Sequence, residues 1–152
     1  MRQQRSGFII NITSIAGFMG LPFRGFYSAT KGSLELITES LRLETAGSGI
    51  RICSLAPGDF ATNIAEGRYQ VPIREDSAYH QTYGASVALM NRHVSHGQDP
   101  ERVGARVYRI LQKKNPSVHY TIGSPLQRFS LVLKRILPDK LYEKLLLNHY
   151  KL

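Results

Sequence analysis

The order strand, helix, strand in the first third of the chain constrains the fold more than any other feature. The apolar run 8–12 is rich in β-branched residues, as a buried strand is. Glycines and a proline make a loop of 14–25. Apolar residues then recur at helical spacing over 26–46, and the run 50–56 predicts a second strand. Strand, helix and strand within about 50 residues form a βαβ unit, so we expect a parallel sheet with a right-handed crossover.

The next segments continue the alternation of helices and strands. The stretch 62–77 has no clear period and predicts an irregular loop with one helical turn, whereas 79–96 predicts a helix. Asp99 followed by Pro100 is typical of a helix start. The stretch 118–123 predicts a third strand, so the fold class is expected to be α/β.

The tail 125–152 mixes leucines with lysines and arginines and predicts two short basic amphipathic helices, 125–136 and 140–147. Such helices can pack against the domain, covering a substrate pocket or a subunit contact, or they can lie on a membrane surface. Packing is the favoured interpretation because most apolar stripes belong to a core. A peripheral membrane contact through this tail remains the alternative.

Length and composition are those of a globular protein. A chain of 152 residues, 42% of them apolar, can bury a core. A single cysteine, Cys53, excludes an internal disulfide, fits a reducing cytoplasm and is expected to be a small buried hydrophobe. The net charge of +9 comes from scattered residues, which favours a basic surface over a nucleic-acid site. No apolar stretch is long enough to span a bilayer, and the first residues lack the apolar core of a signal peptide.

Three polar residues are placed to act on a carbonyl group. Tyr27 and Lys31 are four residues apart, so a helix presents both on one face. Ser14 follows the first strand, at the carboxyl edge of the sheet, where open α/β sheets bind ligands. A hydroxyl, a phenol and an ammonium group at that edge can bind and protonate a carbonyl oxygen. The alternatives are an ordinary helix face for Tyr27 and Lys31, and a capping hydroxyl for Ser14.

Three motifs resemble those of the short-chain dehydrogenase/reductase family. The stretch 11–14 resembles the N-x-S-S motif, 27–31 the Y-x-x-x-K motif, and 57–62 the P-G-x-x-x-T motif. The spacing of thirteen between the serine and the tyrosine also matches. The loop 17–23 is similar to that of the hydroxysteroid dehydrogenase branch. The resemblance is specific over about residues 7–64 and extends over the rest in element order only.

The resemblance implies an NAD(P)-dependent oxidoreductase that interconverts a carbonyl and a secondary alcohol of a small apolar molecule. Tyr27 would act as general acid or base, with Lys31 supporting it by positive charge and holding the nicotinamide ribose. Ser14 would hydrogen-bond the substrate oxygen. The residues that would contact NAD or NADP come from the last two motifs: Tyr27, Lys31, Pro57, Gly58, Phe60 and Thr62.

One part of the family pattern is not found in this sequence. The Gly-rich fingerprint that cradles the cofactor pyrophosphate is missing, as is the residue that selects NAD or NADP. Residues 1–7 resemble an internal join of family members. We therefore expect the C-terminal portion of a longer enzyme, with little activity alone. Residues 1–124 would form about three strands of a Rossmann-like, doubly wound parallel sheet, and 125–152 the helical tail.

A second hypothesis is a non-catalytic binding or oligomerisation module derived from the same family. The helix 26–46 is of the kind that relatives use at a dimer interface, so a homo-oligomer is expected in either case. The sequence does not decide the substrate, the reaction direction or the choice between NAD and NADP.

Overall fold

The computed structural model describes residues 1–64 and 66–152. Three strands, β1 (Gly7–Ile12), β2 (Ile50–Pro57) and β3 (His119–Ile122), form one parallel sheet in the order β1-β2-β3. The predicted α/β class and the three predicted strands are confirmed. The central strand β2 is buried over five consecutive residues, which explains why it reads as an apolar run without polar alternation.

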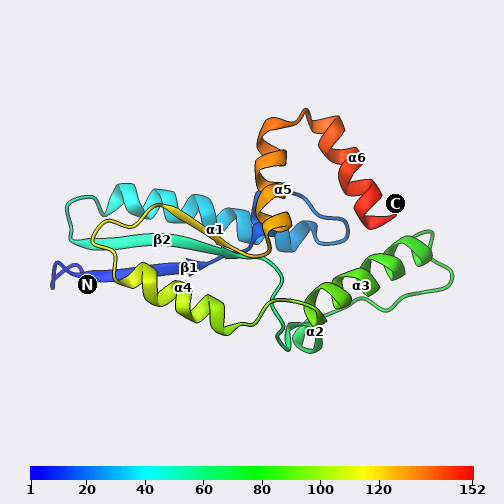
Figure 1. Ribbon diagram of the computed structural model, residues 1–152, viewed down its shortest axis with the longest axis horizontal. Helices are drawn as coiled ribbons and strands as arrows, with labels where there is room; N and C mark the ends of the chain where they lie inside the picture. The colour runs from blue at the N-terminus through cyan, green and yellow to red at the C-terminus, as the bar shows by residue number, and fades with distance from the viewer.

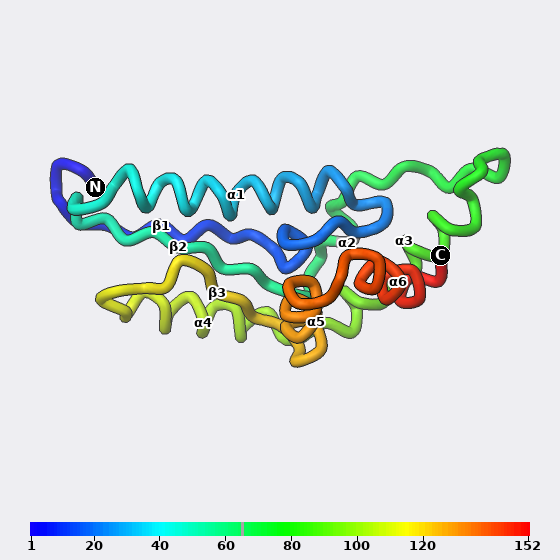
Figure 2. Tube along the Cα trace, turned by 90° about the horizontal axis from the view of Figure 1, so that it is seen from above, coloured from blue at the N-terminus to red at the C-terminus, as the bar shows by residue number. Residues whose placement is uncertain are grey.

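Helices cover both faces of the sheet. Figures 1 and 2 show α1 (Gly25–Glu44) along one face and α4 (Glu101–Leu111) along the other. Successive residues of a strand point to opposite faces, so Cys53 and Leu55 face α4, where both are fully buried with Ile110. The apolar core of the described residues therefore lies between the sheet and α4.

The other helices gather around the carboxyl ends of the strands (Figure 1). These short elements are η1 (Ile15–Phe18), α2 (Ile64–Gly67), α3 (His80–Ser95), α5 (Pro125–Ile136) and α6 (Asp139–Tyr150). Because ligands of open α/β sheets bind at this edge, these elements are positioned to enclose a site. Among the described residues, no helix combines the length and apolar character needed to cross a membrane.

The predicted elements agree closely with the observed ones, although two apolar residues of the helices are exposed. Helix α4 begins at Glu101 with Pro100 at its N-cap position, and the Asp99 carboxylate accepts a hydrogen bond from the Glu101 amide at 2.9 Å. Leu111 on α4 and Ile37 on α1 are 41% and 47% exposed. For Ile37 the physical reason is that α1 presents polar side chains to the sheet.

Candidate active site

Ser14 lies where β1 ends and η1 begins. Its side chain is buried, and its Oγ accepts a hydrogen bond from the Ala16 amide at 3.2 Å, which caps the short helix. The hydroxyl also lies 3.5 Å from the carbonyl oxygen of Pro57. A hydrogen bond of this length is weak, so a substrate oxygen can replace the carbonyl as acceptor at little cost. Ser14 is therefore held in place as an N-cap, while its hydroxyl proton stays available to a better acceptor.

Tyr27 and Lys31 share one face of α1, as their spacing predicts. The Lys31 ammonium lies 5.9 Å from the centre of the Tyr27 ring and donates a hydrogen bond to the Ile12 carbonyl at 3.1 Å. An ammonium group has three N–H donors, so two remain for a ligand. Tyr27 is 37% exposed and reaches a solvent-accessible cleft.

Two glycines let this helix approach the serine loop. A Cβ on Gly32 would lie 2.9 Å from the Gly17 carbonyl oxygen, and a Cβ on Gly17 would lie 2.9 Å from the Lys31 carbonyl carbon. Real Cβ atoms do not tolerate such contacts with backbone. The Gly17–Gly32 approach thus sets how near Lys31 can come to the end of β1.

The candidate site opens into a cleft of about 1480 Å³ at the carboxyl edge of the sheet. The structure places every residue predicted for the site on the wall of this one cleft: Ser14, Tyr27, Lys31, Pro57, Gly58, Phe60 and Thr62. Gly58 is close-packed, because a Cβ there would lie 2.2 Å from the Gln127 Oε1. Residues predicted from three separate motifs are therefore neighbours of one cavity.

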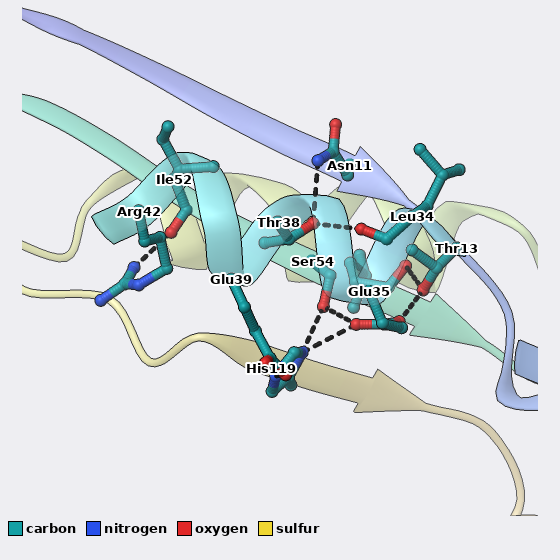
Figure 3. A network of polar contacts seen from close by, with 11 residues as sticks. Asn11, Thr13, Leu34, Glu35, Thr38, Glu39, Arg42, Ile52, Ser54 and His119 are labelled. Atoms are coloured by element: carbon teal, nitrogen blue, oxygen red, sulfur yellow. Dashed lines mark hydrogen bonds and ion pairs between the residues drawn. The ribbon is translucent and has the colours of Figure 1, made fainter. Parts of the chain in front are cut away.

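A buried carboxylate, Glu35, lies one helical turn beyond Lys31 and holds α1 against the sheet (Figure 3). Its Oε1 accepts a short hydrogen bond from Thr13, the residue before Ser14, and its Oε2 accepts one from Ser54 at 2.5 Å. Both hydroxyl groups are buried. The face of α1 that carries Tyr27 and Lys31 thus continues into a polar contact with two strands.

His119 on β3 completes this network (Figure 3). Its Nδ1 lies 2.7 Å from the Glu35 Oε2, and its Nε2 lies 2.9 Å from the Glu39 Oε1. Both ring nitrogens therefore lie within hydrogen-bonding distance of a carboxylate. No motif in the sequence marks His119 as a functional residue. The available signal was the spacing of Glu35 and Glu39, which repeats the four-residue step of Tyr27 and Lys31.

The chain is similar to known short-chain dehydrogenases in both sequence and fold. Residues 1–71 match the family model described as short chain dehydrogenase. The 3-ketodihydrosphingosine reductase of Bacteroides thetaiotaomicron is 34% identical over 144 residues, which cover 94% of this chain and 54% of that protein. A solved short-chain dehydrogenase of Streptomyces avermitilis matches with a TM-score of 0.71 and 25% identity, over 99% of this chain and 52% of that one.

A second solved structure, a short-chain dehydrogenase/reductase of Burkholderia phymatum in complex with NAD, matches with a TM-score of 0.69 and 22% identity. The match covers 88% of this chain and 48% of that one. The chain belongs to the short-chain dehydrogenase/reductase family, a family of oxidoreductases with a Rossmann-like α/β fold. It spans about half the length of the curated relatives it matches. The narrower likeness of the loop 17–23 to hydroxysteroid dehydrogenases stays a prediction.

Proposed function

We propose that this chain supplies the catalytic side of an NAD(P)-dependent oxidoreductase that interconverts a carbonyl and a secondary alcohol. The observation that carries the proposal is the meeting of Ser14, Tyr27 and Lys31 on the wall of one cleft. The relative from Bacteroides thetaiotaomicron is named for the reduction of a ketone, and one solved neighbour was determined with NAD. The first supports a reaction on a carbonyl group, and the second supports a nicotinamide cofactor.

The residues present fit one end of such a cofactor. Lys31 keeps two N–H donors beyond its bond to Ile12, which suits the two hydroxyls of a ribose. The corner formed by Pro57, Gly58, Phe60 and Thr62 lines the same cleft and would hold the nicotinamide. When bound, the nicotinamide supplies or takes up the hydride.

The side chains of this chain would handle the oxygen of the substrate. In reduction, Ser14 donates a hydrogen bond to the carbonyl oxygen and Tyr27 transfers its phenolic proton to that oxygen as the alcohol forms. In oxidation the same proton returns from the alcohol to the phenolate. Lys31 stabilises the phenolate by its nearby positive charge, because opposite charges a few ångströms apart attract.

We further propose that the 152 residues have little activity alone. No glycine-rich phosphate loop occurs in the sequence, and β1 pairs on one side only among the described strands. The test is a fusion of this chain to the nucleotide-binding half of the Bacteroides thetaiotaomicron relative, assayed by NAD(P)H absorbance with ketone substrates. The fusion should turn over, Tyr27→Phe should abolish turnover, and the exposed control Tyr79→Phe should not. Full activity of the Tyr27→Phe fusion, or efficient turnover by the 152 residues alone, contradicts the proposal.

A second candidate function is a non-catalytic oligomerisation module. The observation in its favour is the outer face of α1, where Phe26, Leu36 and Leu43 are 94%, 67% and 79% exposed. Exposed apolar patches of this kind mark interaction surfaces. Gel filtration with cofactor titration separates the candidates, since a discrete oligomer without nucleotide affinity favours the module.

We also propose that the helical tail makes a peripheral membrane contact. On α5 an apolar stripe is exposed at Leu126, Phe129, Val132 and Ile136, and basic residues lie beside it. An amphipathic helix with basic flanks can lie in a lipid interface. Sedimentation with anionic vesicles tests this, and Phe129→Ser should lower the bound fraction.

A further inference from the structure

A basic cluster lies on the wall of the cleft where the start of α1 meets the end of α6. The Arg24 guanidinium donates a hydrogen bond to the Tyr150 hydroxyl at 2.7 Å, and the Arg24 Nε is buried without a partner among the described residues. Tyr150 itself is buried. The guanidinium is therefore held in position by a neutral group, while part of its donor capacity is unused. A partly buried arginine of this kind is satisfied best by an anion.

Two histidines extend the cluster. The rings of His93 on α3 and His149 on α6 are 5.4 Å apart, and His149 packs edge-on against Tyr150. Figure 1 shows the C-terminal end of α6 approaching α3, and the two helices are in contact. Burial, together with the charges of His93 and Arg24, holds the pKa of His149 below its usual range, although Asp59 acts in the opposite direction. The charged neighbours of His149 are therefore His93, Arg24 and Asp59.

Asp59 is the one acidic side chain among the described residues that line the cleft, and it is already engaged. Its Oδ2 accepts a hydrogen bond from the Gln127 side chain at 2.6 Å and lies 3.7 Å from the His93 Nδ1. The cleft also has four residues with permanent positive charge on its wall: Arg24, Lys31, Arg68 and Arg92. The balance of charge in the cleft is clearly positive.

Most of the remaining wall is apolar. Leucines from α5 and α6, including Leu133, Leu145 and Leu146, line the cleft together with Met19. The volume of about 1480 Å³ exceeds the range typical of small-ligand pockets, about 300–1,000 Å³. A long apolar chain fits this wall, and Arg24 lies one helical turn before Tyr27.

We propose that Arg24, with His149 beside it, binds the anionic end group of a long-chain substrate whose carbonyl lies at Ser14 and Tyr27. The substrate class is then an anionic amphiphile, such as a long-chain carboxylate. This inference rests on the proposed function, because it uses the same cleft. A different source of negative charge is the phosphate of the cofactor, and the experiment must separate the two.

The test compares three probes that share one chain and differ in their end group: dodecanoate, dodecanol and dodecylammonium. Binding to the 152-residue chain is measured by calorimetry below the micelle concentration of each probe. We expect dodecanoate to bind about tenfold more tightly than dodecanol, from one charge-assisted pair. Arg24→Met should remove that difference and leave dodecanol binding unchanged. The matched control is Arg128→Met, an exposed residue of α5 outside the cleft, which should change nothing.

Tyr150→Phe gives a second, milder variant, because it removes only the hydroxyl that holds Arg24. It should reduce the preference for dodecanoate severalfold. Equal binding of dodecanoate and dodecanol, or tightest binding of dodecylammonium, overturns the proposal. The proposal is also overturned if NADP⁺ or inorganic phosphate displaces dodecanoate and Arg24→Met loses affinity for NADP⁺ to a matching degree. In that case the basic cluster binds the phosphate of the cofactor. Since these measurements need no turnover, failure of the end-group preference is distinct from failure of the Tyr27→Phe test.

Discussion

Removing the Glu35 carboxylate should destabilise the fold far more than removing any exposed charge on the same helix. In Glu35→Ala, Thr13 and Ser54 each lose a charged acceptor, and such hydrogen bonds contribute about 1.5–3 kcal/mol each. Both hydroxyls have a weaker replacement, because Thr13 lies 3.3 Å from the Leu55 carbonyl and Ser54 lies 3.0 Å from the His119 ring. His119 meanwhile loses one of its two carboxylates.

The expected cost of Glu35→Ala is therefore about 3–5 kcal/mol, the range for breaking one side of a buried pair. Small domains have about 5–15 kcal/mol of stability in total, so the variant can be close to unfolded. Glu35→Gln retains the shape and part of the hydrogen bonding, and it should cost about 1–3 kcal/mol. The matched control Glu39→Ala removes a carboxylate that is 51% exposed, and it should cost less than about 1 kcal/mol.

Urea unfolding followed by circular dichroism measures these differences, with the slope compared between variants to confirm that the unfolded states are alike. Because Glu35 and Ser54 are in contact, the double variant Glu35→Gln/Ser54→Ala should cost less than the sum of the single ones. A Glu35→Ala variant as stable as Glu39→Ala, or strictly additive costs for Glu35 and Ser54, would refute the view that this network holds α1 to the sheet.

Three further predictions concern stability. Gly32→Ala should destabilise the fold by about 1–3 kcal/mol, because its Cβ would meet the Gly17 carbonyl. Gly104→Ala places its Cβ in open space and should stabilise α4 by up to about 1 kcal/mol. Thermal melts measure both changes, and equal effects of the two substitutions would contradict this prediction. Burial lowers the pKa of His149, so the unfolded chain takes up a proton that the folded chain resists, and stability should fall as pH drops through the usual histidine range; this acid dependence should be weaker in His149→Gln. Burial raises the pKa of the Cys53 thiol, so the stability of the fold should decline as pH rises through the usual thiol range. A thiol reagent should modify Cys53 at the rate at which the protein unfolds, which is slower than the rate for a free thiol.

The sequence by itself determined the parts of this protein that local patterns encode. Periodicity placed three strands and the helices between them, and the short spacing from Tyr27 to Lys31 placed both on one face. The serine loop could be located because glycines and a proline mark it. These predictions succeed because each depends on residues that are close in the chain.

The tertiary structure alone decided which distant residues meet. Glu35 and His119 are 84 residues apart, and Arg24 and Tyr150 are 126 residues apart. Each of these residues, taken alone, resembles an ordinary surface or helix residue, because its role arises only when packing brings a partner within hydrogen-bonding distance. The orientation of a helix relative to the sheet determines which of its residues contact the strands. Here α1 directs Glu35 toward the sheet, although glutamate is a residue type that is rarely buried. The residues on which the proposed carbonyl chemistry rests could therefore be identified from the chain, whereas the charge of the cleft and the network behind the site became visible only in the fold.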